Sequence, residues 1–112
     1  MTEAEFTIEL TLGAQKDSRD IYTHVSEIRS IEAADQTFDT LINKVKSLKL
    51  FPERGHISAE LISLGHNEYR QIISIPYRIF YRVINKTVFI ADFRWPKRYS
   101  HFARAAIVEK LI

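Results

Sequence analysis

The segment Pro76–Val83, with the sequence PYRIFYRV, constrains the fold of this chain most, because its side chains alternate with a period of two. Successive side chains of an extended strand point to opposite faces of a sheet. One face would carry Tyr77, Ile79, Tyr81 and Val83, and the other Arg78, Phe80 and Arg82. We predict that the first face packs a core and that the second presents an exposed aromatic ring between two guanidiniums. Such a face suits the binding of phosphates and bases. The alternative is that the two arginines only keep the solvent-exposed face of the sheet soluble.

The length and composition of the chain predict one domain, residues 1–112. A chain of 112 residues with 46% hydrophobic and 27% charged residues is large enough for one core and too short for two. No apolar run approaches the roughly 18 residues of a membrane span. Residues 1–5 are acidic and lack the pattern of a secretion signal, so we expect a cytoplasmic protein with no membrane contact. The absence of cysteine excludes disulfides, thiolate metal sites and cysteine nucleophiles.

Charge is divided unevenly between the two halves of the chain. Residues 1–60 carry 7 Lys or Arg and 11 Asp or Glu, a net charge of −4, whereas residues 61–112 carry 9 and 3, a net charge of +6. This segregation favours a polyanion or an acidic protein as the partner of the C-terminal half. The alternative is that the two halves neutralise each other within one fold.

Hydrophobic periodicity predicts one strand and two helices in the first half of the chain. Alternation of Phe6, Ile8, Leu10 and Leu12 indicates a half-buried strand, which Gly13 ends. Residues 14–28 follow as an amphipathic helix, with Asp17 among its polar residues. Ser30 is the predicted N-cap of a second helix that runs to about Lys49. Two helices joined by so short a link form an antiparallel hairpin.

The second half of the chain has the pattern of a sheet. A loop is predicted from Pro52 to Gly65, followed by strands over residues 69–75, 77–83 and 88–93 in an antiparallel meander. Asn85-Lys86 is the predicted tight turn between the last two strands, since Asn tolerates positive φ. A short C-terminal helix over residues 101–112 completes the prediction. The order of strand, helical hairpin, three-stranded meander and helix is that of an α+β fold.

A series of short motifs follows in order along the chain. They are Leu48–Gly55 (LKLFPERG), Glu60-Leu61, Gly65, Tyr69-Arg70, Pro76–Val83 and Ile90–Asp92. Their order and spacing resemble the RelE/ParE superfamily of type II toxin–antitoxin toxins, and more its ParE or plasmid-stabilisation branch than its RelE nuclease branch. The resemblance spans nearly the whole chain. It implies the RelE/ParE toxin fold and a toxin held in a hetero-oligomer by a cognate antitoxin encoded beside it.

The two branches imply different targets. ParE-like toxins poison DNA gyrase, whereas RelE-like toxins cleave messenger RNA in the ribosomal A site. We expect growth arrest through gyrase, with the ribosome-dependent ribonuclease as the alternative. A further alternative is a non-toxic domain that serves only as an antitoxin-bound repressor component. We expect neither a metal nor another cofactor, since no histidine stands at metal-ligand spacing.

A ribonuclease of this family would use residues on the sheet and after it. By resemblance, Arg78 matches the arginine of a Tyr-Arg motif and Arg98 the basic position after the last strand. Tyr99 and His101 are the candidates for proton transfer, because the unperturbed pKa of histidine is about 6.5. Arg104 stands where some nucleases place an aromatic catalytic residue, which counts against RNA cleavage.

A toxin that acts by binding would use the same region as an interaction surface, since Trp, Tyr and Arg are favoured at binding hot spots. The candidate target-binding residues are Arg70, Arg78, Arg82, Arg94, Trp95, Lys97 and Arg98. By resemblance, Arg70 matches a basic position after the loop. Arg94 matches the Asp-Gly-Arg-Arg element of ParE-like sequences, which here lacks the glycine and the second arginine. We expect Arg78, Arg82, Arg94 and Trp95 to form one patch outside the core; the alternative is that Trp95 caps the core among solvated cations.

Overall fold

The computed structural model describes residues 5–57, 59–65 and 68–95. Its elements in chain order are β1 (Thr7–Leu10), α1 (Leu12–Ile28), α2 (Ile31–Lys46), η1 (Ser47–Lys49), β2 (His56–Ile57), α3 (Ala59–Ile62), β3 (Arg70–Ser74), β4 (Tyr77–Ile84) and β5 (Thr87–Arg94). The predicted C-terminal helix over residues 101–112 lies outside the described residues.

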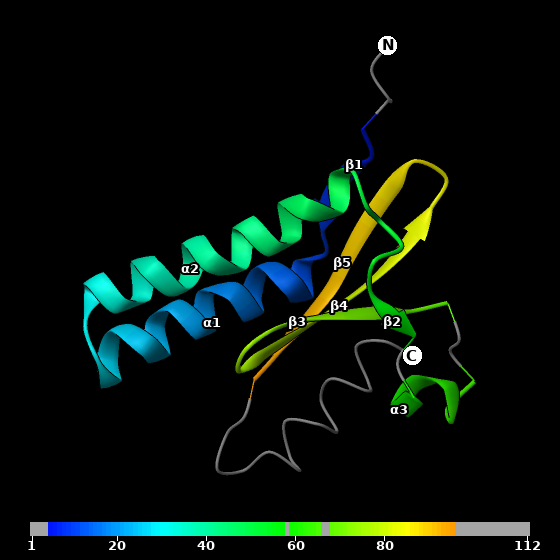
Figure 1. Cartoon of the computed structure of the whole chain (residues 1–112). Coiled ribbons are helices and arrows are strands. Elements are labelled where there is room, and N and C mark those ends of the chain that lie inside the picture. The colour runs from blue at the N-terminus through cyan, green and yellow to red at the C-terminus, as the bar shows by residue number, and fades with distance from the viewer. Residues whose placement is uncertain (1–4, 58, 66–67, 96–112) are drawn as a thin grey trace.

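The strands form one mixed sheet that a helical hairpin covers on one side. The strand order is β1-β5-β4-β3-β2, with β1 parallel to β5 and every other pair antiparallel. The helices α1 and α2 lie side by side, and both contact the sheet, α1 along β5 and α2 along β3 (Figure 1). The predicted α+β fold, with its N-terminal strand, helical hairpin and three-stranded meander, is confirmed.

Polar side chains fix where the two long helices begin. The Thr11 hydroxyl accepts the Ala14 N–H at 3.1 Å and caps α1, so the helix begins at Leu12. The predicted strand end at Gly13 is therefore wrong, because the strand stops at Leu10. Ser30 caps α2 as predicted and accepts the Ala33 N–H at 3.0 Å.

The core lies between the hairpin and the helix-side face of the sheet. Its fully buried members from the helices and η1 are Ala14, Ile21, Val25, Ala34, Leu41, Val45 and Leu48. Those from the sheet include Tyr77, Ile79, Tyr81, Val88, Ile90 and Phe93. The predicted core face of the β4 strand is confirmed. Near the turn that joins α1 to α2, the Tyr22 hydroxyl donates to Asp35 at 2.7 Å and links the two helices.

Tight turns join the strands of the meander. Asn85 adopts φ of 55° between β4 and β5, as the predicted turn requires. Ile75 and Pro76 connect β3 to β4, and the peptide bond between them is cis. The predicted loop from Pro52 to Gly65 is only partly a loop, because it contains β2 and α3. Backbone bonds to β3, at the sheet's edge, order this two-residue strand even though it has no periodicity to detect.

Gly55 allows this connection to approach the sheet closely. Its N–H donates to the Tyr81 hydroxyl at 3.0 Å. A Cβ at this position would lie 2.6 Å from the Tyr81 hydroxyl oxygen and 2.7 Å from the backbone oxygen of Gln71, which no side chain tolerates without a shift. The glycine of the LKLFPERG motif is therefore required by packing.

Asp17 closes the free edge of β5. The strand β1 ends at Leu10, so the backbone of β5 beyond that point has no neighbouring strand on this side. The Asp17 carboxylate is buried and accepts the Phe93 N–H at 3.2 Å, and the Thr11 hydroxyl donates to the Ala91 carbonyl at 3.1 Å. Asp17, one of the polar residues of the predicted amphipathic helix, is thus buried, because its carboxylate serves a backbone donor inside the fold.

None of the helices in the described ranges combines the length and the apolar character that crossing a bilayer demands.

Candidate functional site

The outer face of the sheet, away from the α1–α2 hairpin, carries a pair of opposed arginines. Arg78 on β4 pairs directly with Arg94 on β5, and Ile73 on β3 pairs with Arg78 on its other side. Directly paired residues point to the same face, so these three side chains form one row across three strands. The predicted adjacency of Arg78 and Arg94 is confirmed by this register.

A second row lies beside the arginine pair and crosses four strands. It consists of His56, Gln71, Phe80 and Asp92. The Arg78 Nε donates to the Gln71 side-chain oxygen at 2.9 Å, and the Arg78 guanidinium carbon lies 5.3 Å from the centroid of the Phe80 ring. These contacts orient the Arg78 guanidinium along the sheet.

Phe80 is buried, which corrects the prediction of an exposed ring between two guanidiniums. Its side chain is 1% exposed and packs with Tyr69 and Ala91 in a small second cluster on the outer face. The register of β4 and β5 shifts between Phe80 and Tyr81, so that Ala91 is an extra residue in β5 beside the ring. A sequence pattern of period two does not reveal such a bulge.

Asp92 is a buried carboxylate on the same face as the two arginines. It is 0% exposed and stands two residues before Arg94 in β5. A negative charge in the adjacent row offsets the repulsion expected between two guanidiniums that face each other across a strand pair. The sequence analysis did not select this residue, although it is the only acidic residue between positions 69 and 108.

Arg82 lies on the outer face but apart from the opposed pair. It pairs with Phe89, its guanidinium carbon lies 5.5 Å from the centroid of Tyr69, and its Nη1 lies 3.8 Å from a Glu68 carboxylate oxygen. The contact with Glu68 offsets part of the positive charge of Arg82.

Arg70, another predicted target-binding residue, lies on the other face of the sheet, apart from Arg78 and Arg94. It pairs with the core residue Tyr81 and therefore points to the helix side. Its Nη1 donates to the Gly55 carbonyl at 2.9 Å and lies 3.4 Å from the Glu53 carbonyl. Arg70 holds the connection before β2 in place.

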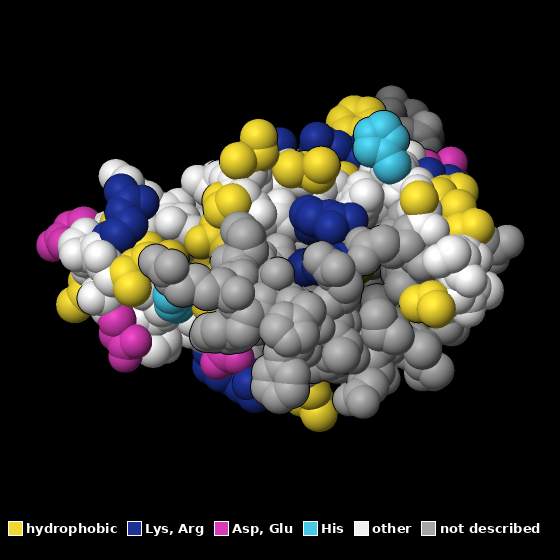
Figure 2. Space-filling model, turned by 90° about the horizontal axis from the view of Figure 1, so that it is seen from below, with side chains coloured by type: hydrophobic (Ala, Val, Ile, Leu, Met, Phe, Trp, Pro, Cys, Tyr) yellow, Lys and Arg dark blue, Asp and Glu magenta, His cyan; other side chains and the backbone are white. Residues whose placement is uncertain are grey.

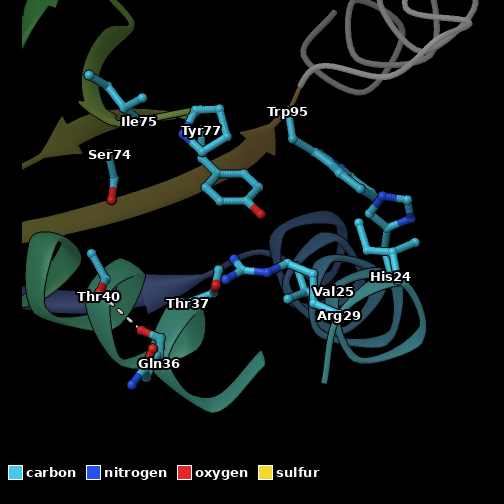
Figure 3. Close-up of a pocket in the computed structure, with 12 residues that line it drawn as sticks. His24, Val25, Arg29, Gln36, Thr37, Thr40, Ser74, Ile75, Tyr77 and Trp95 are labelled. Atoms are coloured by element: carbon cyan, nitrogen blue, oxygen red, sulfur yellow. Dashed lines mark hydrogen bonds between the residues drawn. The ribbon is translucent and has the colours of Figure 1, made fainter. Parts of the chain in front are cut away.

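Trp95 also lies on the helix side, so the predicted single patch with Arg94 is wrong. Its ring meets the His24 ring of α1 edge-on, with 4.8 Å between centroids, and it packs partly against the core (Figure 3). Alternation separates it from Arg94, since adjacent strand residues point to opposite faces. Trp95 caps the core, as the alternative interpretation held.

Trp95 and His24 form one wall of a pocket of about 460 Å³ between the end of the helical hairpin where α1 turns into α2 and the β3–β4 turn (Figure 3). The described lining residues are His24, Val25, Ile28, Arg29, Gln36, Thr37, Thr40, Ser74, Ile75, Pro76, Tyr77 and Trp95. The sequence analysis did not identify this pocket, because its walls come from four separate elements.

Four of the predicted site residues, Lys97, Arg98, Tyr99 and His101, lie outside the described residues, as does Arg104. Their roles stay predictions.

Viewed from below, basic side chains gather near the centre of the molecule with hydrophobic side chains on either side (Figure 2).

Comparison with known proteins identifies the family. Residues 8–94 match the model of the ParE toxin of the type II toxin–antitoxin system parDE. The chain belongs to the ParE toxin family. The match covers β1 through β5 and so includes both the hairpin and the outer-face arginines. Family membership makes the protein a ParE-like toxin of a type II system, with a cognate antitoxin as its partner.

Two solved structures share the ParE fold. A chain of the chromosomal ParDE toxin–antitoxin system from P. aeruginosa superimposes with a TM-score of 0.72 at 19% identity, covering 85% of this chain and 100% of that one. A doubly substituted E. coli toxin RelE in its free state superimposes with a TM-score of 0.59 at 17% identity, covering 96% and 99%. A search of curated protein sequences found no match.

Proposed function

We propose that this ParE-family toxin arrests growth by binding and poisoning DNA gyrase, and that the Arg78–Arg94 pair on the outer face of the sheet engages the target. The ParE family match over residues 8–94 supports the gyrase branch over the ribonuclease branch. The observation that carries the role of the pair is its direct cross-strand register.

The opposed arginines are arranged as a binding group. Two like charges directly opposite each other on paired strands repel, so the approach of the two guanidiniums does not itself stabilise the fold. Arg78 is oriented by Gln71 and by the Phe80 ring, and Ile73 adds an apolar side chain, 48% exposed, to the same row. A pre-oriented arginine beside apolar surface has the composition of a hot spot.

The described residues of the outer face are poorly suited to RNA cleavage. A ribonuclease needs a group that accepts the ribose 2′-proton, and an arginine remains protonated at all relevant pH values. Within the described outer-face rows the only histidine is His56, on β2, which is separated from Arg78 by the whole of β3. Two strand spacings of almost 5 Å each divide the two side chains, which is too far for a shared proton transfer.

A purified gyrase assay tests the proposal. Toxin is added to gyrase, ATP and relaxed plasmid, and DNA is examined after denaturation of the enzyme. We expect loss of supercoiling and accumulation of broken plasmid, while translating ribosomes given the same toxin leave their messenger RNA intact. Cleavage of messenger RNA in the ribosomal A site, with gyrase unaffected, would contradict the proposal and favour the RelE-like alternative.

A growth assay tests toxicity itself. Expression of the chain alone should arrest a bacterial culture, and coexpression of the small protein encoded beside it should relieve the arrest. Unimpaired growth at verified soluble expression would favour the non-toxic repressor component.

A further inference from the structure

The pocket beside the α1–α2 turn has apolar walls and a polar edge. Val25, Ile28, Ile75, Pro76 and Trp95 provide the apolar surface. Ile75 is 89% exposed, so the β3–β4 turn presents bare hydrocarbon at the pocket's edge. A volume of about 460 Å³ lies within the range of pockets that bind small molecules or anchor residues of a peptide.

Unsatisfied hydrogen-bond donors converge on this pocket. Arg29 is exposed, and within the described residues its guanidinium makes no ion pair or side-chain hydrogen bond. The hydroxyls of Tyr77, Thr37 and Ser74 likewise make no hydrogen bond in the described part of the chain. The Tyr77 ring points from the sheet toward the guanidinium of Arg29 (Figure 3). By contrast, the exposed Lys16 of α1 forms an ion pair with Asp20 at 2.8 Å.

The Tyr77 hydroxyl remains a donor across physiological pH. Burial raises the pKa of this phenol above 10.0, and the nearby charge of Arg29 offsets only part of that rise. A protonated phenol beside a guanidinium provides two donors for one anionic group.

The described lining residues include Arg29 and His24 but no Asp or Glu. Among the described lining residues, the positive charge of Arg29 therefore stands beside apolar walls. Its complement is a segment that carries a carboxylate next to apolar side chains.

We propose that this pocket anchors an acidic, apolar segment of the cognate antitoxin, with a carboxylate of that segment bound by the Arg29 guanidinium and the Tyr77 hydroxyl. The inference rests on the toxin–antitoxin partnership of the ParE family and is independent of the toxin's target. Tyr77 and Arg78 are adjacent in β4 and point to opposite faces. The antitoxin anchor and the outer-face arginines are thus separate surfaces.

Calorimetric titration of purified toxin with the antitoxin encoded beside it tests the anchor. Arg29→Glu should weaken binding about 30-fold, the size of the loss of one hot-spot residue. Tyr77→Phe keeps the ring and should weaken binding about 3- to 10-fold, as expected for one hydrogen bond. The matched control is Arg19→Glu, which makes the same charge change on an exposed residue of α1 outside the pocket and should change affinity less than about 2-fold.

A charge swap identifies the antitoxin residue. Each Asp and Glu of the antitoxin is changed to Lys in turn, and one such variant should restore binding to the Arg29→Glu toxin while binding the parent toxin poorly. Thermal melts establish that each toxin variant is folded. If Arg29→Glu does not fold, Arg29→Gln and Tyr77→Phe carry the test.

The growth assay separates this inference from the proposed target. The Arg29→Glu toxin should still arrest growth and should no longer be neutralised by the parent antitoxin. Parent-like affinity of folded Arg29→Glu and Tyr77→Phe would overturn the anchor, whatever the gyrase assay gives. Failure of the gyrase assay would leave the binding measurement unchanged.

Discussion

The two faces of the sheet are built from the same strands but differ in the burial of their side chains. On the helix side, side chains such as Ile79 and Ile90 are fully buried beneath α1 and α2. On the outer face, their sequence neighbours include Arg78 and the exposed Ile73. Alternation thus lets one strand contribute a core residue and a surface residue in turn. The comparison teaches that the helix side determines stability, and we infer that the outer face is free to bind a target.

The helix side itself changes character along its length. Where α1 and α2 pack on the sheet it is closed and apolar, and beside the α1–α2 turn it becomes the pocket with Arg29 and Tyr77. The arginines of the two surfaces differ in how they are held. The Arg78 guanidinium contacts Gln71 and Phe80, whereas Arg29 has no such partner among the described residues. We propose that the first surface binds the target and that the second binds a carboxylate of the antitoxin.

The largest expected effect on stability comes from the helix side. Ile79→Ala empties a site that is 0% exposed and should lower the free energy of unfolding by about 2–5 kcal/mol. Ile73→Ala is the matched control on the outer face, where the same truncation should cost less than about 1 kcal/mol. Urea denaturation of the three proteins measures both. Equal losses would break the comparison between the two faces.

The next effect concerns the close approach of Gly55 to the sheet. Gly55→Ala places a Cβ against both the Tyr81 hydroxyl and the Gln71 backbone oxygen, and should cost about 1–3 kcal/mol through overpacking. Removing the hydroxyl with Tyr81→Phe relieves only one of these contacts. Gly55→Ala should therefore still destabilise the Tyr81→Phe protein, and thermal melts in both backgrounds check this. A neutral substitution would mean that the connection before β2 is not packed as the structure has it.

A smaller effect appears at alkaline pH and also belongs to the helix side. Burial raises the pKa of Tyr77 and of Tyr81 above 10.0 in the folded protein. As pH rises past 10.0, the unfolded chain loses these protons first, so the free energy of unfolding falls. Tyr77→Phe should make this fall shallower when stability is measured from pH 9 to 11. An unchanged slope would show that Tyr77 does not contribute to it.

Much of the fold was predictable from periodicity alone. The four longer strands and the helical hairpin follow from repeated apolar spacing, and Ser30 follows from its capping chemistry. The errors occur where contacts between residues far apart in the sequence determine burial. Phe80 is covered because a bulge brings Ala91 beside it, and Asp17 is buried because its partner is a backbone N–H that no sequence pattern displays.

The candidate site was predicted in part. Arg78 and Arg94 meet because the turn at Asn85 sets the register of β4 and β5. Arg70 and Trp95 were also listed as target-binding residues, but each lies on the helix side. Arg70 pairs with the core residue Tyr81, and Trp95 follows Arg94 and therefore points to the opposite face. The pocket could not be predicted from the sequence, because its walls come from four elements that only the fold brings together.

The most direct test of the central claim compares toxicity with stability for the opposed arginines. Arg78→Ala and Arg94→Ala should change the free energy of unfolding by less than about 1 kcal/mol, because both residues lie outside the core. Both should nevertheless suppress growth arrest, with Arg82→Ala weaker and the helix-surface control Arg19→Ala without effect. Each variant is melted and expressed beside the parent. If both variants melt like the parent and remain fully toxic, the outer face is only a solvated surface and the account is contradicted.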